Sequence, residues 1–307
     1  MDGKLRSVKK GAGIYVEILI QDDLDRIWQL TQDPIQHEKW DLRFTRIRYL
    51  PRTSSEEPQE FLYCTRLGFG IGISGTGSSR SARTPGGREA ISSLQFASDD
   101  RFSLIRSGSG YWKYVSTSAG TRFLTWYDYD VRFGAPGRYF DRFVFRPLLG
   151  WATAWSFDRL RLWVEGKQSP EASLALFVIH FVARLSLAFV WIWQGLVPKL
   201  LYDQRDERQM LAQVGLSPHA LPWIGAGEIL IGMSVLGAWN VRAVFAANGA
   251  LMILGAAIVA AKSPDFIAAA FNPITHNAGV LAIALSGWFA SKTLPSARTC
   301  RRVPPRG

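Results

Sequence analysis

Cysteine and histidine are scarce in this chain. Two cysteines, Cys64 and Cys300, and four histidines stand among 307 residues. Two thiols are too few for a disulfide framework or for a metal site built from four thiolates. We therefore expect two unpaired thiols in a reducing compartment, and we expect no bound metal and no other cofactor.

Charge is also scarce, but only in the C-terminal part. The chain holds 36 Lys and Arg against 25 Asp and Glu, a net charge of +11. Residues 1–170 hold 44 charged side chains, whereas residues 171–307 hold 17, too few to coat a water-facing surface. This excludes a single soluble globule. The many aromatic residues and the lack of a repeat exclude a disordered chain, collagen and a coiled coil.

The start of the chain does not follow the pattern of a secretory signal. Residues 1–12 form a basic tail, and the apolar run after it, Ile14–Ile20, is short and contains Glu17. A signal peptide needs a longer, uninterrupted apolar region. We therefore expect the polar first part of the chain to stay in the cytosol.

Four apolar stretches of 17 to 25 residues follow residue 170. They are Leu174–Pro198, Leu221–Trp239, Ala243–Ala261 and Ile274–Ala290. A hydrocarbon core of ~30 Å needs about 20 apolar residues in a helix. The stretches predict an all-α bundle of four transmembrane helices over residues 172–291, followed by a basic C-terminal tail over residues 292–307.

Basic residues are distributed unevenly around these stretches. Nine Lys or Arg lie on the side that holds both chain ends, and four lie on the other side. Cytoplasmic flanks carry the excess of Lys and Arg, so a multi-pass protein of the cell (inner) membrane with both ends in the cytoplasm is predicted. Basic flanks facing anionic lipid account for much of the net charge. Membrane lipids are thus the expected partners, nucleic acid is not required, and no protein partner is indicated.

Two ionisable residues lie deep inside predicted spans. Arg184 is ten residues from the start of the first stretch, and Glu228 is seven residues from the start of the second. In a core of ~30 Å their levels differ by about 5 Å, which predicts a buried ion pair. Such a pair either fixes the helix register or belongs to a proton path or counter-ion site. Further polar residues within the spans are His180, Asn248, His276 and Asn277.

The first two spans carry residues at a recognisable spacing. They are Arg184, Trp191, the segment Gly195–Leu201, Glu207 and Glu228. With them, residues 172–291 resemble the DoxX-like family of small four-span membrane proteins, although that family's pattern leads us to expect a lysine where His276 stands. The resemblance implies a membrane domain without a defined activity. Relatives in the wider group imply an alternative, a membrane subunit of a quinone-linked redox system.

Residues 13–168 alternate between strand-like and helix-like patterns. The run Ile14–Ile20 predicts a half-buried strand, and Asp22 or Asp23 is placed to cap a helix that ends near Thr31. Turn-forming residues separate six more strand-like runs. These are Phe44–Leu50, Glu60–Gly68, Ile71–Ser81, Arg88–Ala97, Phe102–Tyr114 and Thr121–Phe133.

A long helical stretch, Tyr139–Glu165, follows the last of these runs. Strand, short helices, antiparallel strands and a long final helix make an α+β domain. With the motifs Asp23–Pro34, Trp40 and Trp155–Leu160, this order resembles the START/polyketide-cyclase superfamily (SRPBCC) and its helix-grip fold. The resemblance implies a curved antiparallel sheet that grips the long helix around an apolar cavity for a lipid or other hydrophobic ligand.

We expect ten apolar residues to line that cavity, or alternatively to fill a closed core. They are Trp28, Phe44, Phe61, Phe96, Leu104, Leu124, Trp126, Val144, Leu148 and Trp151.

Motifs of catalysis are few. No G-x-S-x-G elbow is present, and the glycines of Gly68–Gly72 and Gly75–Gly77 lack the lysine of a phosphate loop, so we interpret them as hairpin glycines. His37, Glu38 and Asp41 form either an acid/base cluster or an exposed polar turn. The arginines between residues 43 and 48 either touch anionic lipid or form a solvated face.

The sequence thus predicts a cytosolic helix-grip domain joined by the short linker Gly166–Pro170 to a four-helix membrane domain. We expect the first domain to bind or transfer a membrane-derived hydrophobic molecule at the inner leaflet. A quinone-linked redox subunit is the alternative, and a structural or regulatory membrane protein without a ligand is the second alternative. The sequence leaves catalysis undecided, although binding is favoured over enzyme activity.

Overall fold

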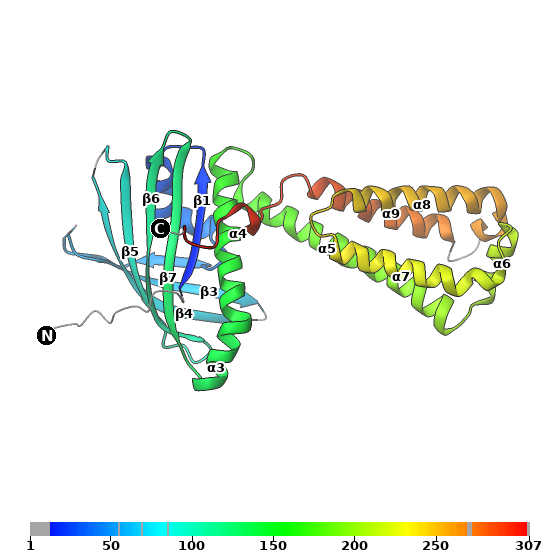
Figure 1. Ribbon diagram of the computed structural model, residues 1–307, viewed down its shortest axis with the longest axis horizontal. Helices are drawn as coiled ribbons and strands as arrows, with labels where there is room; N and C mark the ends of the chain where they lie inside the picture. Colours follow the sequence, from blue (N-terminus) through cyan, green and yellow to red (C-terminus); the bar gives the residue numbers. More distant parts are fainter. Residues whose placement is uncertain (1–12, 55, 69, 85, 269–271, 306–307) are drawn as a thin grey trace. The chain divides into compact units, whose positions relative to one another are not determined.

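The computed structural model of the protein describes residues 13–54, 56–68, 70–84, 86–268 and 272–305. The chain divides into two compact units. Met1–Ser173 together with Pro295–Gly307 form one, which we term the head unit, and Leu174–Leu294 form the other, the helical unit (Figure 1).

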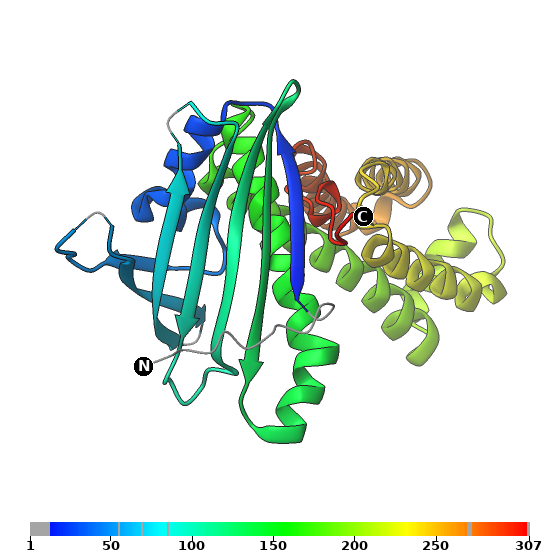
Figure 2. The same ribbon diagram turned by 60° about the vertical axis from the view of Figure 1, so that its left-hand side comes forward.

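The head unit is built on a seven-stranded antiparallel sheet in the order β1-β7-β6-β5-β4-β3-β2 (Figure 2). Its strands are β1 (Ile14–Ile20), β2 (Arg46–Tyr49), β3 (Gln59–Gly68), β4 (Ile71–Arg83), β5 (Glu89–Ala97), β6 (Ile105–Thr117) and β7 (Gly120–Val131). Every strand predicted from alternation is confirmed, with ends that shift by a few residues. The first and last of them, β1 and β7, pair along the whole of β1.

Two short helices follow β1, α1 (Leu24–Gln32) and α2 (Pro34–Trp40). Of the two candidate caps, Asp23 is the one that caps α1, because its carboxylate accepts the backbone N–H of Arg26 at 2.7 Å. Asp33 follows the last residue of α1 and is the N-cap of α2. Its carboxylate accepts the backbone N–H groups of Ile35 and Gln36, the two residues after Pro34. Short polar side chains at N-caps satisfy donors that the helix leaves unpaired.

The long helical stretch is also confirmed. It consists of α3 (Gly134–Phe140), a π-helical turn η1 (Asp141–Phe145) and α4 (Arg146–Val164). The Phe157 ring of α4 stacks on Phe123 of β7 at 4.3 Å, and the hydroxyls of Thr153 and Tyr127 lie 2.8 Å apart. The sheet face toward α4, the inner face, therefore holds the core, and the arrangement is a helix-grip fold (Figure 2).

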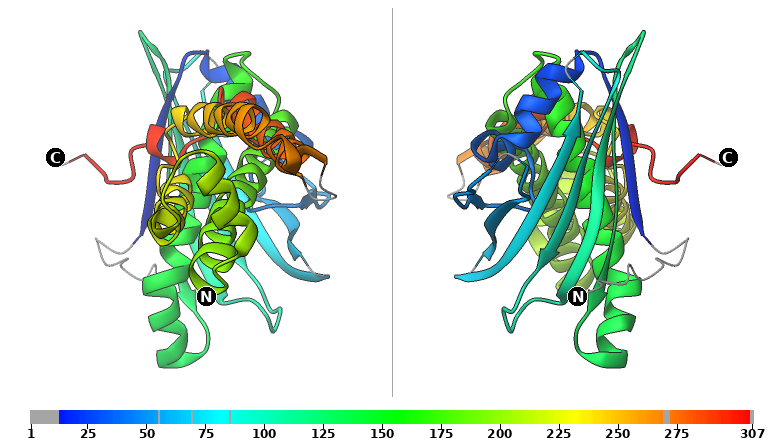
Figure 3. Two further views of the ribbon diagram at one scale, coloured as in Figure 1. Left: turned by 90° about the vertical axis from the view of Figure 1, so that its right-hand side faces the viewer. Right: turned by 90° about the vertical axis from the view of Figure 1, so that its left-hand side faces the viewer.

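The C-terminal segment packs on the head unit (Figure 3). Arg301 and Glu17 of β1 exchange two backbone hydrogen bonds of 2.9 Å each. Just before them, the thiol of Cys300 donates to the carbonyl of Ala154 in α4 at 3.2 Å. The sequence indicated only a basic tail here, whereas residues 300 and 301 contact α4 and β1 of the head unit.

The helical unit contains long apolar helices joined by short turns. Its elements are α5 (Pro170–Gly195, beginning in the head unit), η2 (Leu196–Leu201), α6 (Arg205–Gln213), η3 (Pro218–Ala220), α7 (Leu221–Gly237), α8 (Ala243–Lys262), η4 (Pro264–Ala268) and α9 (Pro273–Ala290). Within the described residues, three helical segments are long and apolar enough to cross a membrane, namely Pro170–Leu201, Pro218–Gly237 and Ala243–Lys262. The fourth predicted stretch forms α9, an 18-residue helix beside α8.

Small residues let these helices approach closely. The Phe245 ring lies where a side chain at Gly287 would begin, 2.1 Å from that position, and a side chain at Gly195 would meet the carbonyl of Gly225 at 2.4 Å. Large apolar side chains such as Phe189 and Leu230 point outward, 61% and 69% exposed. Small residues inside and apolar residues outside are the arrangement of membrane helices.

Candidate functional site

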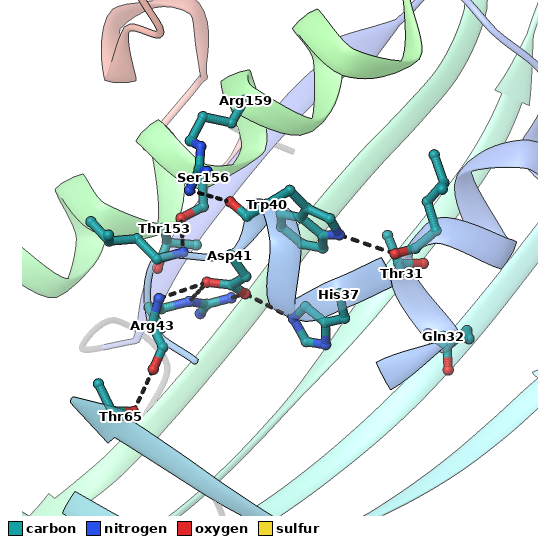
Figure 4. A network of polar contacts seen from close by, with 12 residues as sticks. Thr31, Gln32, His37, Trp40, Asp41, Arg43, Thr65, Thr153, Ser156 and Arg159 are labelled. Atoms are coloured by element: carbon teal, nitrogen blue, oxygen red, sulfur yellow. Dashed lines mark hydrogen bonds and ion pairs between the residues drawn. The ribbon is translucent and has the colours of Figure 1, made fainter. Parts of the chain in front are cut away.

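A buried cluster of charged groups lies at the end of α2. The carboxylate of Asp41 is 2.9 Å from the Nε2 atom of His37 and 2.6 Å from a guanidinium nitrogen of Arg43 (Figure 4). The Asp41 side chain is inaccessible to solvent, and the side chains of His37 and Arg43 are 11% and 13% exposed. An exposed polar turn is therefore the wrong interpretation, and Arg43 does not lie on a solvated face.

Asp41 is ionised in this cluster. Burial alone would raise the pKa of its carboxyl, but the Arg43 guanidinium and the hydrogen bond from His37 outweigh burial and hold that pKa well below its usual range. An ionised carboxylate only accepts hydrogen bonds, so the Nε2 atom of His37 carries the proton it donates. In the neutral ring the Nδ1 atom is then an acceptor, and no hydrogen bond joins it to a described residue.

Aromatic rings fix the His37 side chain. Trp40 stacks on its ring at 4.9 Å, and Phe44 and Trp112 approach with their edges at 5.2 and 5.0 Å. Trp112 belongs to the inner face of β6, since its strand neighbour Tyr114 contacts α1 through the hydroxyl of Thr31. The imidazole is thus held rigidly against the inner face of the sheet.

Glycines let three further aromatic rings lie flat on the inner face. Side chains added at Gly75, Gly77 and Gly108 would each meet a ring at 2.4 Å. The rings belong to Tyr63, Phe61 and Phe96, in that order. Gly68 and Gly70 have φ of +92° and +77° and form the predicted hairpin. Gly72, Gly75 and Gly77 lie inside β4, so the hairpin interpretation is wrong for them.

Part of the inner face stays accessible. Phe44, Tyr63, Leu94 and Phe96 are half-buried and lie on strands β3 to β5 or beside them. Burial nevertheless raises the pKa of the Tyr63 hydroxyl to about 12, so this group stays a neutral hydrogen-bonding group. The inner face thus offers apolar rings beside two polar groups, the Tyr63 hydroxyl and the fixed Nδ1 atom of His37.

The predicted lining residues divide between several places. Phe61 and Phe96 lie on the inner face, Phe44 contacts His37, and Trp28 packs against Tyr114 at 5.1 Å. Leu104 is half-buried just before β6.

The prediction is wrong for Leu124 and Trp126. They alternate along β7 with Phe123 and Tyr127, which contact α4. Successive strand residues point to opposite faces, so Leu124 and Trp126 belong to the outer face, where Trp126 stacks with Tyr111 at 6.3 Å.

It is also wrong for Val144 and Leu148, which are 48% and 56% exposed. The side of the helical stretch that carries them faces away from the sheet, because the neighbouring Asp141 is the residue that contacts β7. Trp151 is half-buried and stacks on Trp155 at 6.1 Å.

Arg159 ties α4 to the end of α2. Its guanidinium donates to the carbonyl of Trp40 at 3.2 Å (Figure 4). It also donates to the carbonyls of Lys39 and Pro170 at 3.0 and 2.7 Å. Burial lowers the pKa of Arg159 to about 10, so the group stays charged at neutral pH. A cation at the C-terminal end of α2 is favoured by the helix dipole. The motif that contains Arg159 was the one sequence signal near this contact.

In the helical unit, Arg184 does not pair with Glu228, which overturns the predicted ion pair. Arg184 donates to the carbonyls of Val235, Trp239 and Val241 at the end of α7 and beyond, at 2.8 Å for Trp239. The sequence predicted the depth of each residue in the membrane. Depth alone does not determine the direction in which a side chain points around its helix. Arg184 thus caps the free carbonyls of a helix end.

Glu228 pairs instead with Lys199 in the π-helical segment η2, at 3.1 Å. The same lysine nitrogen lies 3.3 Å from the carboxylate of Glu207 in α6. Lys199 is 7% exposed, and its amine also donates to the carbonyl of Gln194 at 3.3 Å. All three charged residues belong to the spacing that resembles the DoxX-like family, yet the sequence did not bring them together.

The other predicted polar residues of the spans have separate roles. The indole N–H of Trp191 donates to Asn248, which joins α5 to α8. The amide of Asn277 donates to the carbonyl of Met252 at 3.4 Å, and His276 is exposed. His180 accepts from the Nε atom of Arg184 at 3.1 Å. Among the described residues, no group of three or more His, Cys, Asp or Glu is placed to hold a metal ion.

Fold and site together define a membrane protein with a helix-grip head and a helical membrane part. The model of the DoxX-like family matches residues 188–285. The chain is 44% identical over 250 residues to the "Uncharacterized membrane protein YndG" of Bacillus subtilis (strain 168), covering 78% of this chain and 93% of that relative. The protein belongs to the family of that membrane protein.

Solved structures resemble the head unit more distantly. A STAR-related lipid transfer protein of Xanthomonas axonopodis is 13% identical, with a TM-score of 0.39 over 52% of this chain and 90% of that chain. The Zhui aromatase/cyclase of Streptomyces sp. R1128 is 14% identical, with a TM-score of 0.34 over 45% and 87%. These values are too low for any conclusion about a ligand.

Proposed function

We propose that this protein is an integral membrane protein whose head unit binds a hydrophobic small molecule on the inner face and exchanges it with the inner leaflet. One observation carries the proposal: the rings of Trp40, Phe44 and Trp112 hold the His37 imidazole beside the half-buried Tyr63, and its Nδ1 atom makes no hydrogen bond with a described residue. Binding sites for small molecules combine apolar walls with a few convergent polar groups.

The polar group indicates one property of the ligand. An acceptor that is held in place and largely shielded from water favours a ligand with a hydrogen-bond donor, such as a hydroxyl, at the end that reaches His37. Arg43 does not attract an anionic ligand there, because its guanidinium is bonded on two nitrogens to Asp41, at 2.9 and 2.6 Å. A long-chain alcohol has the required chemistry.

The chain path supports four membrane crossings with both ends in the cytoplasm. The chain leaves the head unit at Ser173 and returns to it at Pro295, so both ends of the helical unit lie on one side of the membrane. The number of crossings is therefore even, and α9 is the fourth crossing in addition to the three long apolar segments named above. We expect reporter proteins fused at residue 1 and at residue 307 to give cytoplasmic signals in both cases.

Photo-crosslinking in proteoliposomes tests ligand binding. The full chain is incubated with a long-chain alcohol that carries a diazirine, and the labelled peptides are mapped by mass spectrometry. We expect labels on β3 to β5. Ser79 pairs with Leu94 and lies on the inner face, whereas Ser78 pairs with Gln95 and lies on the outer face. The variant Ser79→Trp places a bulky ring on the inner face and should abolish the labelling of β3 to β5. The variant Ser78→Trp should leave that labelling unchanged. Labels confined to α5–α9, or equal labelling of the two variants, would oppose the proposal and favour a ligand-free structural protein.

A second candidate, a quinone-linked membrane subunit, rests on His180. Its Nε2 atom accepts from Arg184, so the ring proton resides on Nδ1, which is buried and has no acceptor among the described residues. A buried donor without a partner is unfavourable, and a quinone carbonyl would supply the acceptor between the rings of Trp239 and Phe245, 4.7 and 5.5 Å from the imidazole.

Menadione tests this candidate. Quenching of the intrinsic tryptophan fluorescence by menadione should saturate in the full chain and should be lost in His180→Phe. The matched variant His276→Phe, at an exposed position of α9, should bind normally. Unsaturable quenching, or equal behaviour of the two variants, would rule the candidate out.

A further inference from the structure

The start of the long helical stretch presents large apolar side chains to the outside. Tyr139 and Phe143 are each 67% exposed, Phe140 is 52% exposed, and Val144 and Leu148 follow at 48% and 56%. These residues recur at spacings of three to five along α3, η1 and α4, so they share one side of the helical stretch. We term this set the aromatic stripe.

The opposite side of the same stretch is polar and buried. The carboxylate of Asp141 accepts the hydroxyl of Tyr129 at 2.7 Å and the Nε–H of Arg146 at 2.9 Å. A surface helix of a soluble protein turns its apolar side toward the core. Here Asp141 and the ring of Phe145, which lies 6.2 Å from that of Tyr129, face the sheet, while the residues of the aromatic stripe face outward. Packing inside the head unit therefore does not explain the aromatic stripe.

Basic groups accompany the aromatic stripe. Arg138 and Arg142 are exposed, and neither forms an ion pair with a described residue. The Arg142 guanidinium lies 5.5 Å from the centre of the Phe143 ring. On the neighbouring turn, Arg101 lies 4.7 Å from the ring of Phe102, which is 57% exposed.

That turn belongs to the same end of the head unit. Arg132, just before α3, donates to the carbonyl of Asp100 at 2.7 Å and to that of Ser98. The turn that carries Phe102 is thus fastened to the residue that precedes the helical stretch.

We infer that the aromatic stripe docks on the surface of an anionic lipid bilayer, with its rings at the level of the head groups. Aromatic and apolar side chains flanked by arginine are the composition of helices that lie in the membrane interface. The arginines complement anionic head groups. The chain itself crosses the membrane, so the bilayer is always present at high effective concentration. This inference is independent of the ligand proposed for the inner face.

Fluorescent labelling of the full chain in vesicles tests docking. In a Cys64→Ser, Cys300→Ala background, a single cysteine at Phe143 or at Ile35 is labelled with NBD; both parent residues are 67% exposed. In phosphatidylcholine vesicles with phosphatidylglycerol, the label at 143 should shift to the blue and be quenched by nitroxide-bearing lipids. The label at 35 should behave as in water.

Charge removal gives the second readout. Arg138→Gln and Arg142→Gln should each lower the equilibrium constant for docking about fivefold in anionic vesicles and leave it nearly unchanged in pure phosphatidylcholine. The inference would be overturned if the label at residue 143 showed the emission wavelength and the lack of quenching expected of the label at residue 35. A blue shift without quenching by lipid nitroxides would also overturn it, because it would identify a second protein copy as the partner.

Discussion

The amine of Lys199 lies 3.1 Å from a carboxylate oxygen of Glu228, so Glu228 pairs with Lys199 and not with Arg184. Double-variant cycles should therefore find coupling in one pair and not in the other. We expect Lys199→Met and Glu228→Gln to show an interaction free energy of about 0.5 to 3 kcal/mol, and Arg184→Met and Glu228→Gln to add within about 0.5 kcal/mol. Thermal unfolding of the purified full chain in one detergent measures both, and coupling between Arg184 and Glu228 alone would contradict the contacts described.

Asp41 predicts a pH dependence of the head unit. The pKa of its carboxyl is held below its usual range in the fold, so its contribution to the free energy of unfolding is fully present above the unfolded pKa of about 3.9. This contribution is lost as the pH falls from there toward the lower pKa of the folded state. Asp41→Asn also leaves Arg43 buried without its counter-charge, which costs about 3 to 5 kcal/mol at neutral pH.

Acid titration of the tryptophan signal from the head unit should show both effects. The variant Asp41→Asn should be less stable at pH 7 and should lose less of its remaining stability on acidification than the natural chain. Asp25→Asn is the matched control, because the Asp25 side chain is 70% exposed. If Asp41→Asn lowered the free energy of unfolding at pH 7 as little as the control does, the cluster would not be buried in solution.

The two cysteines predict a simple test of the C-terminal segment. Burial raises the pKa of the Cys300 thiol to about 12, whereas Cys64 is half-buried. Thiolates are the reactive form, so a maleimide at pH 7.5 should label Cys64 and spare Cys300 in the folded chain. Substituting Pro for Arg301 removes a backbone donor to Glu17, and it should speed labelling of Cys300 only. Equal labelling of the two thiols in the natural chain would show that the segment is detached.

Much of the fold follows from patterns that the backbone itself imposes. Alternation of apolar residues has the period of a strand, and glycine, proline and aspartate mark the turns, so all seven strands and the long helix could be predicted. The predicted stretch Tyr139–Glu165 begins five residues after the helix begins at Gly134, since Gly134 and Pro136 are weak helix signals. The C-terminal segment had no such period, because it packs through two backbone bonds and a few side chains.

The candidate site was harder to predict, for geometric reasons. On β7 both faces carry large apolar side chains, Phe123 and Tyr127 on one and Leu124 and Trp126 on the other, so alternation alone cannot say which face is inner. The cluster around Asp41 is close in sequence, but its burial depends on Trp112 and on α4, which are far away along the chain. A useful signal was present in the spacing of His37 and Asp41, which places them on one face of a helix end.

The glycines of β4 predict how tightly the inner face is packed. A side chain at Gly77 would begin 2.4 Å from the Phe61 ring and 2.9 Å from the carbonyl of Gln95, whereas at Gly72 the nearest atom would be 3.8 Å away. Gly77→Ala should thus lower the free energy of unfolding by about 1 to 3 kcal/mol, because the ring has to move. Gly72→Ala, in the same strand, should be neutral or slightly stabilising.

The combination Gly77→Ala with Phe61→Leu separates this cause from a general weakening of the strand. If the collision with the ring explains the loss, the smaller leucine should relieve part of it, and the two changes should be less destabilising together than the sum of each alone. The crosslinking of the diazirine alcohol should fall in Gly77→Ala and persist in Gly72→Ala, since only the first displaces a ring of the inner face. Additive effects on stability, or equal crosslinking in the two alanine variants, would mean that Phe61 does not lie over Gly77 in the folded chain.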